Sequence, residues 1–359
     1  MKVDLFDYEL PPAQIAQQPT PEREGARLMV LPADGDGGAP VHTTVASLPD
    51  LLPKQSLVVL NDTRVVPARL LGVKADSGGK VEIFLVRRVG TREVDGGDLD
   101  VWKALGKSSK SLRMGTSVVV GPLVVRLLGR SEMDGLLEVG LLTMNGKPVD
   151  EVLKEVGHVP LPPYIKRDDA DADRERYQTV FARVDGAIAA PTAGLHLTRG
   201  MLGRFIVNGA ETTTVTLHVG LGTFQPVTVD DFDAHAMHEE HYEVSRPAQA
   251  AVARARERGA AVVAIGTTVV RTLETAADPA RPGLVSAGSG ATRLLIQPGY
   301  PFKVVDVLVT NFHLPKSTLL ALVCAFGGTE RVLDAYRTAV KEGYRFFSYG
   351  DAMLLWRAR

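Results

Sequence analysis

Four polar-rich segments, each at the end of an apolar run, carry the residue types that could do chemistry. They are NDTRV from Asn61, APTAGLHLT from Ala190, VTLHVGLGTFQPV from Val215 and VTNFHLPKSTL from Val309. Histidine titrates near neutrality, so a histidine in such a segment can act as a general acid or base. Because ligands collect where the strands of an α/β sheet end, these segments predict one polar cleft.

Three histidines fall in or beside these segments. His196 ends the APTAGLH turn, His218 follows the run VTL, and His313 follows the run VLVTNF. A single histidine so placed is more often a structural residue, but three of them favour a shared site. The polar residues expected beside them at other strand ends are Asn311, Lys316, Thr267 and Thr268. The residues alone therefore indicate an α/β enzyme with a histidine-bearing cleft and a β insert.

The most metal-like cluster consists of His235, His238 and His241, which stand beside Glu239 and Glu240. Their spacing does not put all three histidines on one helical face, as the i, i+4 pairing of a zinc helix does. A single histidine acting as an acid or base is therefore favoured over a metal site.

The acidic run at Asp169, Asp171 and Asp173 imitates the start of a calcium-binding loop. Arg174 stands where that loop needs glycine and Val180 where it needs glutamate, so we expect a solvated loop. The sequence also contains no GxxxxGK[ST] phosphate loop and no HExxH zinc motif.

Apolar runs and helical periods predict the elements that position the cleft. Residues 56–60 and 304–310 predict buried strands, and residues 261–265 predict another strand, followed by a helix from Thr267 through Thr275. Further helices are expected at residues 246–258, 317–326 and 330–341, the second ended by Gly327 and Gly328.

The sequence pattern changes at residues 69–142, where short runs of valine and leucine are separated by Gly, Asp and Ser clusters. Turn signals at intervals of roughly 8–15 residues predict a small β-barrel or sandwich. The next helical period covers Val149–Val156. We therefore predict an α/β (α+β) catalytic domain, discontinuous over residues 1–68 and 157–359, with a β-barrel domain inserted at residues 69–156.

Composition fits a globular protein of two domains, because the chain has 359 residues, of which 45% are hydrophobic. The single cysteine, Cys324, lies in the apolar run LLALVCAF and is expected to be a core residue. One cysteine fits a reducing compartment. The start of the chain lacks a signal-peptide pattern, and no run of about 18 apolar residues predicts a membrane span. We expect a cytoplasmic protein.

The net charge of −1 gives no overall indication of a nucleic-acid partner. Charge is uneven, however, because residues 64–113 contain eleven Lys and Arg against six Asp and Glu. This local excess is compatible with phosphate contact and equally with a solvated barrel surface.

Nearly the whole chain resembles the tRNA ribosyltransferase-isomerase family of queuosine biosynthesis. The resemblance runs from VDLFDYELP to YRFFSYGDAML and includes LNDTRVVPARL, GHVPLPPYI, APTAGLH, VTLHVGLGTFQPV, MHEEHYEV, AIGTTVVRTLE and VTNFHLPKSTL. Leu197 and His241 depart from the usual family pattern, which has phenylalanine and an aromatic residue there, and both keep side-chain bulk.

The resemblance implies transfer of the ribosyl part of S-adenosylmethionine to 7-aminomethyl-7-deazaguanine at the wobble position of tRNA. The ribose would rearrange to an epoxycyclopentanediol to give epoxyqueuosine-tRNA, while adenine and L-methionine leave. The sulfonium acidifies the adjacent 5′ carbon, so a base must remove that proton, and an acid should assist the departure of adenine. No metal and no cofactor beyond S-adenosylmethionine as co-substrate is implied, and a monomer is expected.

Site roles also follow from the resemblance. His196 and His218 would transfer protons, with His238 and Glu240 as reserves. The residues expected to contact substrate are Asp62, Arg64, Arg167, Arg176, Tyr177, Gln178, Thr192, Gly194, Thr267, Thr268, Arg271, Asn311, His313, Lys316 and Ser317. The barrel residues expected to contact tRNA phosphates are Lys80, Arg87, Lys103 and Lys107.

Structural alternatives stay open at several of these positions. Asp62 and Arg64 would orient the modified base or ribose, but they could instead cap a strand end. Thr267 and Thr268 would open a helix whose N–H groups receive the methionyl carboxylate, or they could simply cap that helix.

Two other functions have less support from the sequence. An S-adenosylmethionine-dependent tRNA methyltransferase would need a glycine-rich loop after the first strand of a Rossmann-like domain, and Gly220 and Gly222 lack the third glycine of such a fingerprint. A non-catalytic tRNA-binding protein would not need histidines concentrated near strand ends.

Overall fold

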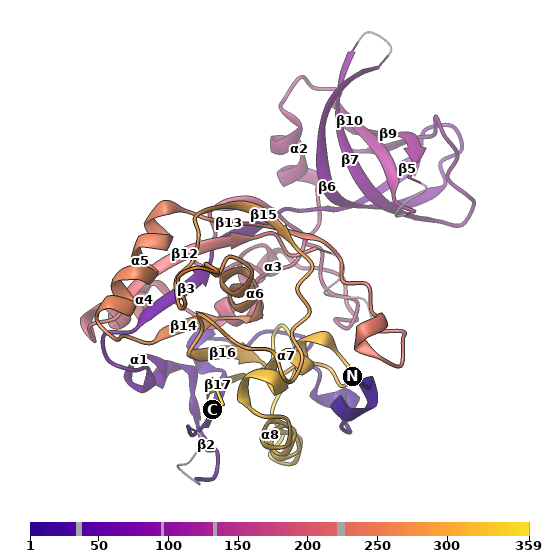
Figure 1. The fold of residues 1–359 in the computed structure, drawn as a ribbon. Helices are drawn as coiled ribbons and strands as arrows, with labels where there is room; N and C mark the ends of the chain where they lie inside the picture. The colour runs from indigo at the N-terminus through magenta and orange to yellow at the C-terminus, as the bar shows by residue number, and fades with distance from the viewer. Residues whose placement is uncertain (34–37, 95–96, 132–134, 221–226, 359) are drawn as a thin grey trace.

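The computed structural model describes residues 1–33, 38–94, 97–131, 135–220 and 227–358. Two lobes are evident in Figure 1, one built on a mixed sheet with helices on both faces and one on an antiparallel sheet. The prediction of an α/β main lobe is therefore confirmed. Part of the VTLHVGLGTFQPV segment, residues 221–226, lies outside the described residues.

The large lobe is organised by a mixed sheet whose central strands are parallel. Strands β12, β3, β14 and β16 run parallel, and β17 pairs antiparallel with β16. The order in the described sheet is β15 (Gly288–Thr292), β13 (Glu240–Val244), β12 (Glu211–Leu217), β3 (Leu57–Asn61), β14 (Val262–Ile265), β16 (Val307–Asn311), β17 (Ala352–Trp356), β1 (Arg27–Leu31), β2 (Val41–Thr44).

Both faces of this sheet are buried, which explains why its central strands are continuous apolar runs. Leu57 and Val59 of β3 pack on one face with helices α5–α8, whereas Val58 and Leu60 pack on the other face with α1 and α4. The helices are α1 (Leu48–Leu51), α4 (Arg199–Val207), α5 (Arg246–Glu257), α6 (Thr267–Thr275), α7 (Thr318–Gly327) and α8 (Thr329–Lys341).

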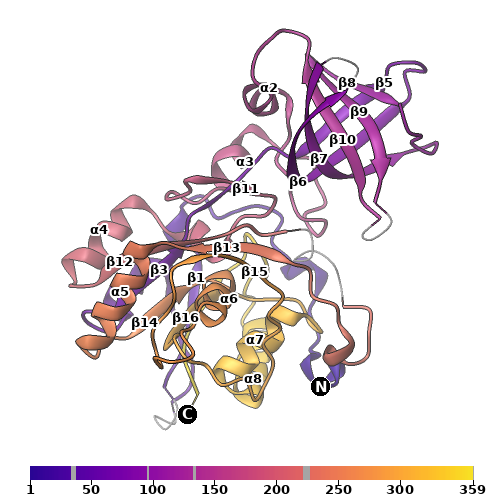
Figure 2. The ribbon, with the colours of Figure 1, turned by 45° about the horizontal axis from the view of Figure 1, so that its top comes forward.

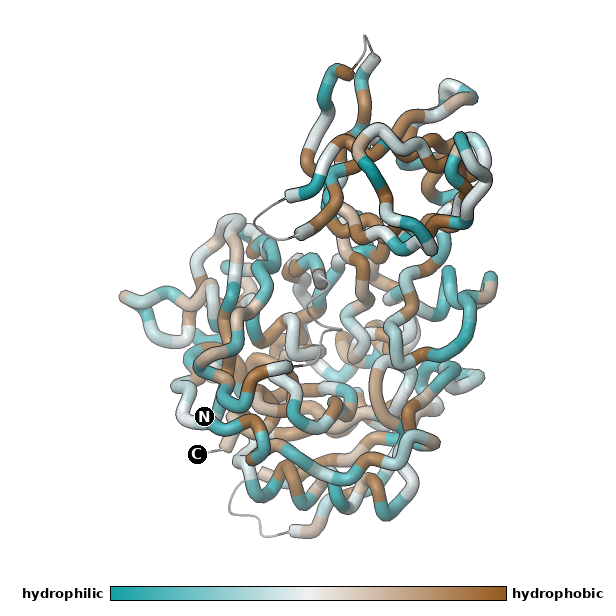
Figure 3. Tube along the Cα trace, turned by 90° about the vertical axis from the view of Figure 1, so that its right-hand side faces the viewer, coloured by the Kyte–Doolittle hydropathy of each residue, from teal (hydrophilic) through white to brown (hydrophobic). Residues whose placement is uncertain are grey.

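The small lobe is a closed barrel of six antiparallel strands with its own core, and apolar segments run through the interior of both lobes (Figure 3). Strand β10 pairs with both β7 and β9, which closes the sheet on itself. The order is β10 (Leu137–Thr143), β7 (Gly97–Ser108), β6 (Lys80–Val94), β5 (Arg69–Lys74), β8 (Ser117–Val120), β9 (Leu123–Arg130). Helix α2 (Val149–Val156), as predicted from its period, packs Val152 and Leu153 into this core.

The chain enters the barrel after Pro67 and leaves it at Gly157. Figure 2 shows the barrel joined to the large lobe by the chain segments before β5 and after α2. Strand β4 (Thr63–Val65), paired with β11 (Val184–Ala187), carries the chain from β3 toward the barrel. The backbones of Arg69 and His158 pair with each other, with N···O distances of 3.3 and 2.8 Å.

The predicted strand at residues 304–310 starts later than expected, at Val307. The amides of Val304 and Val305 each donate at 3.0 Å to the buried carboxylate of Glu274 and are therefore unavailable to the sheet. Helix α7 also runs one residue further than predicted, through Gly327, where a side chain would come within 2.7 Å of Leu355.

The expected solvated loop around Asp171 is wrong. Asp171–Arg176 form helix α3, in which Asp173 is buried and accepts hydrogen bonds from Arg167 at 2.6 and 2.9 Å and from the Tyr349 hydroxyl at 2.7 Å. The alternation of charges resembled an exposed loop because Tyr349, which helps to bury Asp173, is distant in sequence.

Within the ranges that the structure describes, no helix is long and apolar enough to cross a membrane.

Gly157 at the junction should tolerate no side chain. A Cβ there would lie 2.2 Å from the Pro67 carbonyl oxygen and 2.6 Å from that of Leu153. We expect Gly157→Ala to lower the free energy of unfolding by about 1–3 kcal/mol, since overpacking shifts backbone. Urea denaturation can be followed through Trp102 in the barrel and Trp356 in the large lobe.

The matched control is Gly203→Ala in α4, where a new Cβ meets nothing within 4 Å. This change should stabilise the protein by about 0.5–1 kcal/mol, since alanine is the better helix former. Equal stability of the two variants would contradict the steric account of the junction.

Candidate active site

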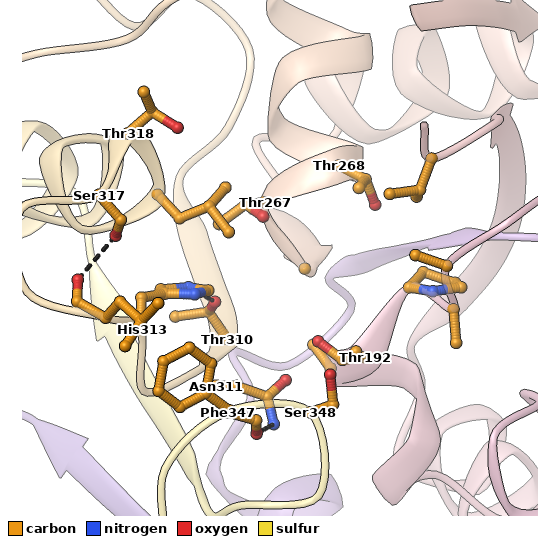
Figure 4. A pocket seen from close by; sticks show the side chains of 18 of the residues that line it. Thr192, Thr267, Thr268, Thr310, Asn311, His313, Ser317, Thr318, Phe347 and Ser348 are labelled. Atoms are coloured by element: carbon orange, nitrogen blue, oxygen red, sulfur yellow. Dashed lines mark hydrogen bonds between the residues drawn. The ribbon is translucent and has the colours of Figure 1, made fainter. Parts of the chain in front are cut away.

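A cavity of about 560 Å³ lies at the carboxyl edge of the parallel strands. Its floor is formed by the ends of β14 and β16, and its walls by the first turns of α6 and α7 and the turn before β17 (Figure 4). The polar residues that line it are Thr192, Thr267, Thr268, Arg271, Thr310, Asn311, His313, Lys316, Ser317, Thr318 and Ser348. The volume and the few convergent polar groups are typical of a small-molecule site.

Helix α6 presents its amino end to the cavity. Gly266 is the N-cap residue, with φ of 98°, and no side-chain cap of the first turn is found within the described residues. The Thr268 hydroxyl instead accepts a hydrogen bond of 3.1 Å from the Asn61 amide. The alternative that Thr267 or Thr268 simply caps the helix is therefore wrong, and the open N–H groups form a positive end that suits an anion.

Arg271, one turn further along α6, adds a guanidinium to the same wall. It is buried and ion-paired with the buried carboxylate of Glu240, and its Nε donates to the Leu294 carbonyl at 3.1 Å. Among the described residues, no group accepts from its Nη2. A second, smaller pocket behind this ion pair is lined by His235 and His238, so Glu240 and His238 lie across Arg271 from the cavity.

His313 lines the cavity and His196 does not. Nε2 of His313 lies 2.8 Å from the Thr310 hydroxyl, and burial lowers the pKa of His313 to about 3. His196, at the end of the 3-10 helix Thr192–His196, lies behind Asn311. Burial, followed by the charges of Arg345 and Arg23, lowers the pKa of His196 to about 4.

His218 also lies outside the cavity lining. Its Nδ1 is 2.8 Å from the Thr63 hydroxyl, and its ring packs so closely on Gly186 that a Cβ there would be 2.8 Å away. Burial lowers its pKa, with a smaller contribution from His241. The structure thus brings His313 to the cavity, separates the other two histidines from it, and leaves their catalytic roles as predictions.

Two residues of the cavity wall have a strained backbone. Phe347 and Lys316 have φ of 73° and 58°, a region that bulky side chains rarely adopt. The Phe347 ring packs against Tyr164 at 4.4 Å, and Lys316 is ion-paired with Asp4 at 2.7 Å and Asp7 at 3.2 Å. Hydrogen bonds from Lys316 to these carboxylates raise its pKa. Such strain is concentrated at functional sites.

The residues of the NDTRV segment make structural contacts at the edge of the sheet and beside the barrel junction. Asp62 is buried and accepts from Thr216 at 2.7 Å and from Arg183 at 2.8 Å. Arg64 lines a separate pocket of about 160 Å³ beside the barrel junction, together with Gln178, whose amide bonds to both the N–H and the carbonyl of Val65.

Of the remaining residues predicted to contact substrate, one lines the cavity and the others hold the structure around it. Tyr177 lies between the cavity and the junction pocket and lines both. Arg176 donates to the carbonyls of Thr20 and Pro21, and Arg167 holds Asp173. Gly194 packs so closely on Phe181 that a Cβ would come within 2.7 Å.

Three residues that line the cavity were missed as ligand contacts. They are Tyr164, in the GHVPLPPYI segment, and Phe347 and Ser348, in the turn before β17. Asp351 holds this turn by accepting hydrogen bonds from the backbone amides of Arg27 and Arg345 at 2.9 and 2.8 Å.

The basic residues of the barrel differ in how far they are exposed to solvent. Lys80, Arg87 and Lys107 are exposed, whereas Lys103 is mostly buried and lies 3.3 Å from Glu138. No group of three or more His, Cys, Asp or Glu side chains that could hold a metal is found within the described ranges.

Comparison with known proteins assigns a family. The sequence profile of a family described as queuosine biosynthesis protein matches residues 3–355. Proteins named S-adenosylmethionine:tRNA ribosyltransferase-isomerase from Sorangium cellulosum and Anaeromyxobacter sp. are 54% and 52% identical, over 99% and 100% of this chain and 98% and 100% of theirs. The crystal structure of S-adenosylmethionine tRNA ribosyltransferase from Thermotoga maritima is 35% identical and covers 98% of this chain and 99% of its own, with a TM-score of 0.53.

The neutral, buried His196 predicts a loss of stability on acidification. Unfolded histidine takes up a proton near pH 6.5, whereas folded His196 does so only near pH 4, so the unfolding free energy falls as pH drops from 6.5 toward 4. His196→Gln should reduce the loss between pH 6.5 and 5 by about 1.5 kcal/mol, at about 1.4 kcal/mol per pKa unit.

Urea denaturation of both proteins at pH 7.5, 6.5 and 5 checks this expectation. The difference at pH 7.5 measures the cost of the substitution itself and serves as the control. Parallel pH dependences in the two proteins would contradict a neutral His196.

Proposed function

The chain belongs to the queuosine biosynthesis protein family, and on this premise we propose that its cavity binds S-adenosylmethionine for transfer of the ribosyl group to tRNA. The observation that carries this proposal is the pairing of an open helix amino end with the Arg271 guanidinium on one wall. An α-carboxylate suits such a wall, because helix N–H groups and arginine both recognise anions. The apolar remainder of the cavity suits an adenine ring.

The proposed reaction gives epoxyqueuosine-tRNA, adenine and L-methionine from S-adenosylmethionine and tRNA carrying 7-aminomethyl-7-deazaguanine. A base removes the acidified proton on the 5′ carbon, and the bond to adenine breaks while a proton donor assists adenine as it leaves. The amine forms a bond to the ribosyl group and loses a proton, and closure of the epoxide breaks the carbon–sulfur bond of the sulfonium and releases L-methionine. The candidates proposed for proton transfer are His196, His218, His238 and Glu240. For His196, a positioning role through its contact with Asn311 is the rival proposal. S-adenosylmethionine is a substrate here, and no other cofactor is proposed.

The tRNA is proposed to contact both lobes. The carboxyl end of β3 leads through β4 into the barrel, so the cavity edge of the sheet and the barrel are joined within residues 62–68. We propose that residues 69–156 form an inserted domain whose exposed Lys80, Arg87 and Lys107 contact phosphates, with Lys103 beside them. A cytoplasmic monomer is the proposed working form.

Product analysis tests the reaction class. Incubation with S-adenosylmethionine and aminomethyl-modified tRNA should release adenine and methionine in equal amounts, measured by liquid chromatography and mass spectrometry. Unmodified tRNA is the control and should give neither product. Formation of S-adenosylhomocysteine would point instead to a methyltransferase, and binding of tRNA without any adenine would point to a non-catalytic protein.

The carboxylate site has its own test, in which Arg271 and Glu240 are changed together so that neither charge stays buried alone. The double variant Arg271→Gln/Glu240→Gln should bind S-adenosylmethionine about 10-fold more weakly or worse, because a charge-assisted hydrogen bond contributes about 1.5–3 kcal/mol. Equilibrium dialysis measures this affinity.

Decarboxylated S-adenosylmethionine is the matched ligand. The unaltered protein should prefer S-adenosylmethionine over it, and the double variant should lose that preference. A preference of the same size in both proteins would exclude Arg271 as the carboxylate ligand.

A further inference from the structure

Asn311, at the end of β16, is held in one orientation by two acceptors. Its Nδ2 lies 3.1 Å from Nε2 of His196 and donates to the Phe347 carbonyl at 3.2 Å. The Phe347 carbonyl can only accept, so the amide nitrogen must face it. Both N–H groups of Asn311 are therefore used on the side away from the cavity, and this hydrogen bonding decides which way the amide points.

His196 must be a neutral acceptor for this arrangement to hold. Its Nε2 receives the Asn311 N–H, which leaves the ring proton on Nδ1. The burial and the two nearby arginines that lower its pKa to about 4 also keep the ring neutral at physiological pH. A protonated His196 would present a donor to Asn311 and break the contact.

The second acceptor is placed by strained backbone. Phe347 adopts φ of 73°, and its own amide donates to the Phe312 carbonyl at 3.0 Å. Strain of this kind costs roughly 1–3 kcal/mol and persists only where the surroundings impose it. Its consequence here is that the Phe347 carbonyl points at Asn311.

The Oδ1 atom of Asn311 is left without a protein partner at the cavity wall. Asn311 is 2% exposed, lines the cavity, and in Figure 4 its oxygen lies on the side opposite the nitrogen that faces the Phe347 turn. Among the described residues, none donates a hydrogen bond to Oδ1. An unsatisfied buried acceptor costs about 1–3 kcal/mol, which a donor on a bound ligand would recover.

We propose that Asn311 is a substrate-binding residue whose Oδ1 accepts a hydrogen bond from an N–H or O–H group of the substrate, and that His196 is a positioning residue that holds the Asn311 amide. This inference rests on the proposed function. It differs from proton transfer by His196, because His196 does not line the cavity and touches it only through Asn311.

The donor has two possible sources with the same chemistry. S-adenosylmethionine offers ribose hydroxyls and the adenine amine, and the modified tRNA offers its aminomethyl group. A donor on S-adenosylmethionine makes Asn311 act on binding of that substrate, whereas a donor on tRNA makes it act only when tRNA is present.

Variants of the full-length protein separate these sources. Asn311→Ala should weaken S-adenosylmethionine binding in equilibrium dialysis by about 10-fold if the donor is there. If the donor is on tRNA, the dissociation constant for S-adenosylmethionine should stay unchanged while kcat/KM for modified tRNA falls about 10-fold. Either result supports the proposal, and a change of less than about 2-fold in both quantities overturns it.

Substitutions of His196 separate positioning from proton transfer. His196→Leu should impair the same step as Asn311→Ala, and His196→Gln should restore most of that loss, because the glutamine oxygen can accept from Nδ2. The double variant Asn311→Ala/His196→Leu should be no worse than Asn311→Ala alone. Additive losses, or a His196→Gln protein about 100-fold slower than the parent, would show proton transfer instead and overturn the proposal.

His42→Leu is the matched control, since it also removes a histidine that contacts another side chain, here the Tyr344 hydroxyl at 2.7 Å, away from the cavity lining. It should leave both readouts unchanged. Near-ultraviolet circular dichroism checks the folding of each variant, and if Asn311→Ala does not fold, the His196 pair carries the same test. Adenine release by the unaltered protein is measured first, so failure of the proposed function is distinguished from failure of this inference.

Discussion

The side chain of Asn61, buried at the end of β3, fixes the edge of the sheet on which the cavity is built. Its Nδ2 donates to the Leu217 carbonyl at 3.0 Å and to the Thr268 hydroxyl at 3.1 Å. Its Oδ1 accepts from the amides of Leu217 at 3.0 Å and Thr63 at 3.2 Å. One amide therefore joins β3 to β12, to α6 and to the turn into β4. A buried amide with all of its partners is stabilising, whereas loss of one partner costs more than the bond itself contributes.

Asn311 ends the parallel strand β16, which is separated from β3 by β14, and shows the opposite condition. Its nitrogen is fully used, but no described protein group satisfies its oxygen. The same residue type at the same edge thus serves the fold at Asn61 and faces the cavity at Asn311. Arg271 provides the complementary case, because its buried Nη2 has no acceptor among the described residues. A ligand that offers both an anion and a hydrogen-bond donor would satisfy both groups.

Much of the fold could be predicted from the sequence because its signals are local. The apolar run before Asn61, the helical period of Val149–Val156 and the valine-rich runs of the barrel each report on a single element. Asp173 was misread, and the roles of the histidines could not be ranked, because burial and partners depend on distant residues. His196 lies next to Asn311, 115 positions away, and Asp173 next to Tyr349, 176 positions away. Which histidine reaches a cavity is set by these long-range contacts.

Several features that cost folding energy lie around the cavity. Phe347 and Lys316 are strained, His196 and His313 are buried without charge, and the oxygen of Asn311 has no donor among the described residues. Elsewhere the large lobe buries continuous apolar runs on both faces of its sheet. This burial contributes stabilising free energy that offsets the cost of these features. A substitution could remove the energetic cost of each feature. It would also disturb the geometry that orients Asn311 and leaves the N–H groups of the first turn of α6 open. Their presence together at one edge is what a fold under selection for binding, and not for stability alone, is expected to show.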